Sequence, residues 1–154
     1  MKKINKHSWA TVVLVALCAV LSSFALPGAH SFQLYVDSKL VVDQYVTRDA
    51  IIPKVMLDPA ESNNQITLKY SECNRTVSGR TLTIKDEQNK ILREWHFDGT
   101  TSGYKDPMTL NVKDLVALKP NKGALKLFYA SNDFKEGQQV AYFIVGKDVT
   151  AAIK

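Results

Sequence analysis

The residues that could do chemistry in this 154-residue chain are few. It holds three histidines and two cysteines, and it has no G-x-S-x-G, H-E-x-x-H, C-x-x-C, G-x-G-x-x-G or P-loop pattern. A Ser-His-Asp or Cys-His site has little material, because Cys73 and His96 stand apart and nothing places them together. A pair of carboxylates for glycoside hydrolysis remains an alternative, because the distance between the two groups in space decides whether they can act together, and the sequence does not show that distance. We predict that the protein is not an enzyme.

The first 31 residues have the three parts of a secretory signal peptide. A basic start of the MKK type, typical of bacterial chains, precedes an apolar run over residues 9–21 and a segment of small residues. The run is shorter than the ~20 residues that a membrane span needs. We predict cleavage after Ser31 and export of residues 32–154 to the periplasm, the cell surface or the medium, without membrane insertion of the mature domain.

Two other cleavage points bear on His30. Cleavage after Ala29 would make His30 an amino terminus that can hold copper with a second imidazole, and this start resembles copper-carrying sandwich proteins and polysaccharide monooxygenases. Pro27 disfavours that cut, because the peptidase reads an extended small residue there. Cleavage after Ala25 exposes no histidine. Copper binding is the least favoured alternative, with His96 as second ligand, and we predict no metal and no cofactor.

Removal of the leader changes the charge of the protein. Three of the 20 Lys and Arg residues lie in it and none of the 15 Asp and Glu residues, so the formal charge falls from +5 to +2. A nearly neutral domain with interspersed charges gives no electrostatic reason to bind nucleic acid or anionic lipid. The domain retains Cys73 alone, which excludes an internal disulfide and leaves stability to the core. Cys73 is expected at a turn or bulge, either tucked in or paired with another chain.

Alternation of apolar and polar residues with a period of two dominates from Phe32 onward. It predicts a hairpin over residues 32–46, a strand at 65–70 with Ile66, Leu68 and Tyr70 inward, and a second hairpin over 80–97. Three further strands are expected at 108–112, 124–130 and 139–145, the last covered on both faces.

A short helix is expected at residues 111–120, with Asn111 as its cap and Pro120 as its end. About eight short strands and one short helix predict an all-β fold. We expect a single antiparallel β-sandwich, immunoglobulin-like or jelly-roll-like, after the signal peptide.

Three polar stretches, at 59–64, 98–107 and 131–139, are expected to be loops, where binding residues commonly lie. Tyr104 and Phe134 are aromatic side chains among charges, and they can stack on a sugar or anchor a protein. We predict a ligand site of Tyr104, Phe134, Asp106 and Asp133. The alternative is that both rings fold back over the edge of the core. His96 is expected on the outer face, opposite Trp95 and Phe97.

One short stretch resembles a known family. The residues "LYVDSKLVVD" at 34–43 are similar to the "LYVDGKLV" hairpin of PA14-like and other carbohydrate-binding sandwiches, with Ser38 in place of the usual glycine. The likeness covers ten residues and implies a hairpin at this position.

The sequence leaves three hypotheses about function. The first is an exported, non-catalytic binding or interaction domain of the bacterial cell envelope, with a glycan or an envelope protein as partner and weak homo-association. The alternative is a structural subunit of the envelope that assembles through a sheet edge, which an exposed unpaired strand would favour. The third is the copper protein built on His30.

Overall fold

The computed structural model describes residues 30–61, 64–73, 75–118 and 124–146. They form nine strands, one short α-helix and one turn of 3₁₀ helix. In chain order these are β1 His30–Val36, β2 Lys39–Tyr45, β3 Lys54–Leu57, η2 Pro59–Glu61, β4 Gln65–Glu72, β5 Thr76–Lys85, β6 Ile91–Ser102, β7 Met108–Asn111, α2 Val112–Ala117, β8 Ala124–Ala130 and β9 Gln138–Val145.

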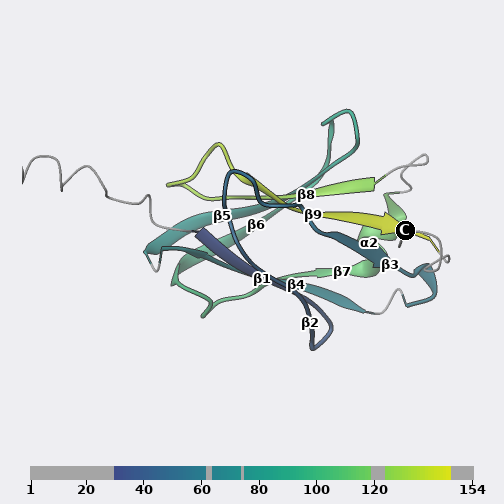
Figure 1. The fold of residues 1–154 in the computed structure, drawn as a ribbon, viewed down its shortest axis with the longest axis horizontal. Coiled ribbons are helices and arrows are strands. Elements are labelled where there is room, and N and C mark those ends of the chain that lie inside the picture. The colour runs from purple at the N-terminus through teal and green to yellow at the C-terminus, as the bar shows by residue number, and fades with distance from the viewer. Residues whose placement is uncertain (1–29, 62–63, 74, 119–123, 147–154) are drawn as a thin grey trace, which may run out of the picture.

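The strands form two sheets that pack face to face as a sandwich (Figure 1). One sheet has the order β2-β1-β4-β7 and the other the order β3-β9-β8-β5-β6. Inward-facing side chains of both sheets make a single apolar core, as the alternation predicts. Its members include Phe32, Leu34, Ile66, Leu68, Leu82, Ile84, Leu125, Leu127 and Phe143, each at most 2% exposed.

Both predicted hairpins and the strand at 65–70 are confirmed. β1 pairs antiparallel with β2 around the turn at Asp37, whose φ is 55°. β5 pairs antiparallel with β6. In β4, Ile66, Leu68 and Tyr70 are at most 3% exposed, so the period-two pattern gives the correct inward face.

One predicted loop is partly wrong, because β6 continues to Ser102 through the first half of the stretch assigned to residues 98–107. The polar residues there pair with the first residues of β5, on the far side of a register shift around Gly79. Thr101 is 7% exposed, so even this threonine-rich end is covered. Backbone pairing with a neighbouring strand, which composition does not reveal, extends the element.

The ninth strand, β3, is absent from the sequence prediction. It has four residues, follows Pro53 and runs parallel to β9, with the amide of Tyr142 donating to the Pro53 carbonyl at 2.8 Å. A strand this short shows no measurable alternation, and its partner lies some 90 residues away in sequence. The outer face of β9, which was expected to be covered, is only partly covered, since Tyr142 and Ile144 there are half-buried.

The predicted helix is confirmed at α2, which follows β7 of one sheet and precedes β8 of the other. Asn111 has the extended backbone of a cap residue, with φ −86° and ψ 135°, but its side chain makes no capping hydrogen bond. The amide of Val112 instead donates to the Asn64 carbonyl at 2.9 Å. Pro120, the expected end, lies outside the described residues. In the part of the chain described, no helix is long and apolar enough to cross a membrane.

Candidate functional site

The two aromatic residues predicted to bind ligand lie at the same end of the sandwich, beside the start of β1. The Tyr104 hydroxyl donates to Ser31 Oγ at 2.8 Å. The Phe134 ring packs edge-on against His30, with ring centroids 4.9 Å apart. Both side chains are half-buried against their own chain. Both rings thus fold back over the edge of the core, which was the alternative to a ligand site. A ligand role for Tyr104 and Phe134 stays a prediction.

The two predicted aspartates differ in their surroundings. Asp106 pairs with Arg80, whose Nη2 contacts the Asp106 carboxylate and whose Nη1 donates to the Asp106 carbonyl at 2.6 Å. Asp133 is exposed. Of the four predicted residues, Tyr104, Phe134 and Asp106 therefore contact side chains of their own chain, whereas Asp133 is exposed.

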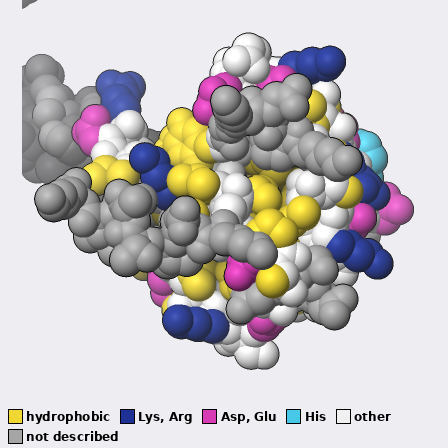
Figure 2. Space-filling view, turned by 90° about the vertical axis from the view of Figure 1, so that its right-hand side faces the viewer, with side chains coloured by type: hydrophobic (Ala, Val, Ile, Leu, Met, Phe, Trp, Pro, Cys, Tyr) yellow, Lys and Arg dark blue, Asp and Glu magenta, His cyan; other side chains and the backbone are white. Residues whose placement is uncertain are grey.

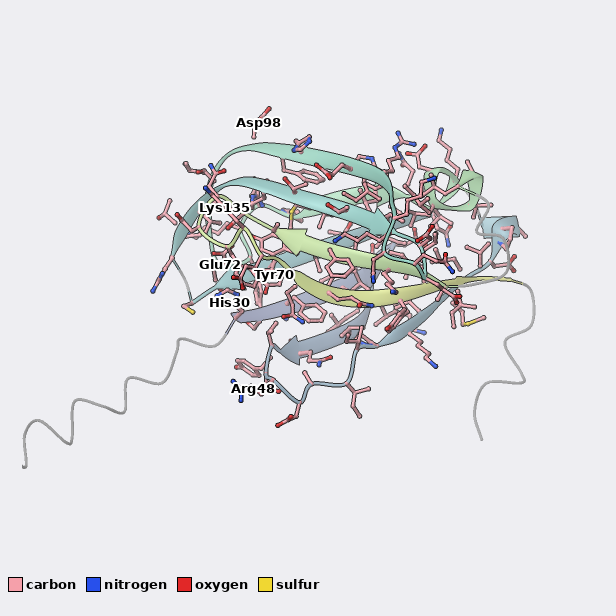
Figure 3. All side chains as sticks on the ribbon, turned by 90° about the horizontal axis from the view of Figure 1, so that it is seen from above. His30, Arg48, Tyr70, Glu72, Asp98 and Lys135 are labelled. Atoms are coloured by element: carbon pink, nitrogen blue, oxygen red, sulfur yellow. The ribbon has the colours of Figure 1, made fainter. Side chains whose placement is uncertain are left out.

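Sequence reasoning missed a polar layer that fills this end of the sandwich. His30, Glu72 and Arg80 occupy inward positions on β1, β4 and β5, in the same alternation as the core residues before or after them. Glu72 is 4% exposed and Arg80 is 2% exposed. Figure 3 shows His30, Tyr70 and Glu72 together at one end of the molecule. The inward parity of Glu72 was readable in the sequence and was the available signal.

Two stacked tyrosines connect the sheets in this layer. The rings of Tyr70 on β4 and Tyr129 on β8 stack with centroids 3.8 Å apart. The Tyr129 hydroxyl donates to the Glu72 carboxylate at 2.8 Å, and the Tyr70 hydroxyl lies 3.1 Å from His30 Nδ1. These contacts satisfy polar groups that burial would otherwise leave without water.

Burial raises the pKa of both hydroxyls. For Tyr70 the next causes are the nearby charges of Glu72 and Cys73, which add to the rise in pKa. For Tyr129, the hydrogen bond to Glu72 and the charges of Glu72 and Tyr70 add to the effect of burial, while Arg80 opposes it. Both phenols therefore stay neutral at ordinary pH and act as hydrogen-bond donors or acceptors.

Cys73 follows β4 of one sheet, whereas His96 lies on β6 of the other. Cys73 is half-buried at a turn with φ 54°, which confirms the turn expected there. His96 is on the outer face of β6 as predicted, with its side chain 69% exposed. Its ring nitrogens lie 3.2 Å from Thr81 Oγ1 and 3.4 Å from Glu94 Oε1. Such an exposed Glu-His-Thr arrangement is open to water, which screens its charges.

The copper hypothesis needs His30 and His96 close together. They lie on β1 and β6, which belong to different sheets, and His96 faces outward. Among the described residues, no group of three or more His, Cys, Asp or Glu side chains could hold a metal ion.

An open sheet edge is the second distinctive surface. β2 ends one sheet and has β1 as its hydrogen-bonded neighbour. Apolar side chains on β2 and in the connection to β3 are exposed: Leu40 by 44%, Val41 by 39%, Tyr45 by 69% and Ile51 by 86%. Of the five large apolar side chains exposed in the described residues, four lie here. An edge of this composition can pair with another chain.

A groove of about 680 Å³ runs between this edge and β3, the edge strand of the other sheet. Around β1 and β2 its lining residues are Val36, Asp37, Ser38, Lys39, Val41 and Val42, with Asn64 just before β4 of the same sheet; around β3 they are Pro53, Lys54, Val55 and Met56. Figure 2 looks onto the end of the molecule where β3 and β9 finish and shows hydrophobic side chains at the surface there. The edges of the two sheets thus frame a depression lined by both apolar and polar side chains.

Comparison with known proteins gives no family for this chain. No protein-family model matches it, and no curated protein matches it.

Proposed function

We propose that this chain is an exported, non-catalytic interaction domain of the bacterial cell envelope that binds a protein partner through the open edge of β2. The exposed apolar side chains of β2, above all Tyr45, carry the proposal. An edge strand offers unpaired amide and carbonyl groups, and an extended segment of another chain can add to it as a further strand.

A protein partner is favoured over a glycan at the predicted ligand site by the burial of its two aromatic side chains. Sugar binding uses an exposed ring face, whereas Tyr104 and Phe134 are half-buried against Ser31 and His30. The non-catalytic assignment is supported by the buried polar layer, in which the Glu72 carboxylate is occupied by Tyr129. Export is supported by the basic start and the apolar run of the leader; in this proposal the exported domain begins after Ala25, because cleavage after Ser31 would remove His30 and Ser31.

We also propose that the sandwich is immunoglobulin-like rather than jelly-roll-like. The order β9-β8-β5-β6 corresponds to strands G, F, C and C′ of a variable-type domain, and β1-β4-β7 corresponds to A, B and E. β2 is then an addition beside strand A, which supports a role for this strand apart from the common framework.

The second candidate is a structural subunit of the envelope that assembles through the same edge. Two features of β2 weigh against unrestricted edge-to-edge assembly. The pairing of β1 and β2 shifts register between Leu34 and Tyr35, and Lys39 places a charge at the start of the strand. Bulges and edge lysines are common means of limiting strand addition between identical chains.

Photo-crosslinking in the living cell tests the proposal. A benzophenone amino acid replaces Tyr45 on the edge, and the control places it at His96 on the outer face of the other sheet. We expect a discrete protein adduct from position 45 that is absent from position 96. The added substitution Val41→Lys should abolish it, because it replaces an exposed apolar side chain of the edge with a charge, whereas Ile91→Lys on β6 should not. Equal adducts from both positions, or an adduct insensitive to Val41→Lys, would refute the proposal.

A further inference from the structure

We infer that the groove between β2 and β3 binds a short extended segment whose apolar side chains alternate and which carries a carboxylate. This inference rests on the proposed function and adds the chemistry of the partner segment. It follows from the size of the groove, the apolar side chains among its lining and its two lysines.

The edge strands β2 and β3 of the two sheets lie on the same side of the sandwich. The groove lies on that side, between these two strands. The other half of that side is closed by the connection from β2 to β3, where Gln44 Nε2 donates to the Ile51 carbonyl at 3.1 Å. Beneath that connection a cavity of about 10 Å³ remains, lined in part by Val46 and Ile52. The chain therefore seals one half of this side with its own residues and leaves about 680 Å³ open in the other.

The floor of the open half suits apolar side chains. Val36, Val42, Val55 and Met56 contribute to its lining; the first two and Met56 are half-buried, and Val55 is 7% exposed. Burying the apolar surface of this lining under another chain is favourable in proportion to the apolar area removed from water. Each residue that a partner places into the groove therefore gains by being apolar.

The walls fix the conformation and length of the bound segment. β3 has four residues, which span ~13 Å at the rise of an extended strand. A segment of about four residues fits that length, and its side chains alternate between the groove and solvent. A partner strand thus directs every second side chain to the floor.

The rim selects for negative charge. Lys39 and Lys54 line the groove, and neither forms an ion pair with another described residue. The one carboxylate among the lining residues, Asp37, accepts a hydrogen bond from the Gln65 amide at 3.0 Å. Two lysines that line the same groove and have no carboxylate partner among the described residues complement an acidic residue in the segment.

Blocked, fluorescently labelled peptides of alternating valine and threonine test the inference by anisotropy. The three peptides carry aspartate, asparagine or lysine at the central solvent-facing position. We expect the aspartate peptide to bind best and each lost lysine to weaken it two- to fivefold, the range for partly solvated ion pairs. The double variant Lys39→Glu/Lys54→Glu should reverse the preference towards the lysine peptide. Lys90→Glu, an exposed lysine of the β5–β6 turn, is the matched charge control.

The outcomes separate this inference from the proposed function. Equal binding of the three peptides, or a preference unchanged by the double variant, overturns the carboxylate. No peptide binding, with the edge adduct at Tyr45 retained, overturns the groove and leaves the proposed function standing. A concentration-dependent dimer in sedimentation that Val41→Asn dissociates would assign the groove to a second copy and overturn the partner segment. Loss of both peptide binding and the adduct overturns both.

Discussion

Removing the carboxylate of Asp106 should destabilise the protein more than removing the buried arginine that it pairs with. Arg80 is 2% exposed, and its guanidinium contacts both the carboxylate and the carbonyl of Asp106. Within the described residues, Arg80 Nε has no hydrogen-bond partner. Asp106→Ala therefore leaves a buried positive charge with a single carbonyl, the costly way to break such a pair.

The expected magnitude lies between that of buried and surface pairs. Loss of one partner of a buried pair costs about 3–5 kcal/mol, and an exposed pair contributes up to about 1 kcal/mol. The Asp106 side chain is 55% exposed, so water replaces part of what it supplies, and we expect about 2 kcal/mol. Arg80→Met removes the charge and the unpaired Nε together and should cost under about 1 kcal/mol.

Urea unfolding, monitored by the fluorescence of Trp95, measures these differences in the free energy of unfolding, provided that all variants have the same m-value. The two single variants, the double variant and Asp98→Ala, an exposed aspartate on β6, complete the comparison. Adding Arg80→Met to Asp106→Ala should restore stability, because no buried charge then remains. An Asp106→Ala variant within about 0.5 kcal/mol of the parent protein, or less stable still with Arg80→Met added, would refute the reasoning.

Three more predictions concern the same end of the fold. Burial raises the pKa of Tyr70 and Tyr129 above the unfolded value of about 10, so the unfolded chain loses protons first and the free energy of unfolding should fall as pH rises above 10. Urea midpoints from pH 8 to 11 should show this slope, and a Tyr129→Phe variant that keeps it in full would contradict the assignment. Gly137→Ala should cost at least about 1 kcal/mol by thermal unfolding, since φ is +69° and the new Cβ would lie 2.8 Å from the Tyr129 carbonyl oxygen, whereas Gly146→Ala, with open space, should cost less. A domain that starts at residue 32 should melt at a lower temperature than one that starts at residue 26, because it lacks His30 and Ser31 and their contacts with Phe134, Val46 and Tyr104; equal melting temperatures would contradict this.

Much of the fold was readable because half-buried strands alternate. Ile66, Leu68 and Tyr70 follow that pattern and are buried, and both hairpins carry it on two neighbouring strands. β3 and the end of β6 were missed because their pairing partners, and not their own residues, make them strands. The start of β1 at His30, two residues before the expected domain start, has the same origin, since His30 and Ser31 pair with β4.

The candidate sites were less accessible to sequence reasoning. Aromatic residues in polar loops suggested Tyr104 and Phe134, but composition does not say whether such rings face solvent or their own core. The groove was invisible, because its two walls are separate edges that meet when the sheets pack. The exposed side chains of β2 read as ordinary strand residues until the sheet order made β2 an edge.

The sequence by itself determined the all-β class, the two hairpins, the short helix and the inward face of β4. These follow from local periodicity and turn chemistry, which act over a few residues. Tertiary structure alone decided that Glu72, Arg80 and His30 share a buried layer and that β2 and β3 are the edges that frame a groove. Both depend on contacts between strands distant in sequence, whose pairing is set by packing of the whole core.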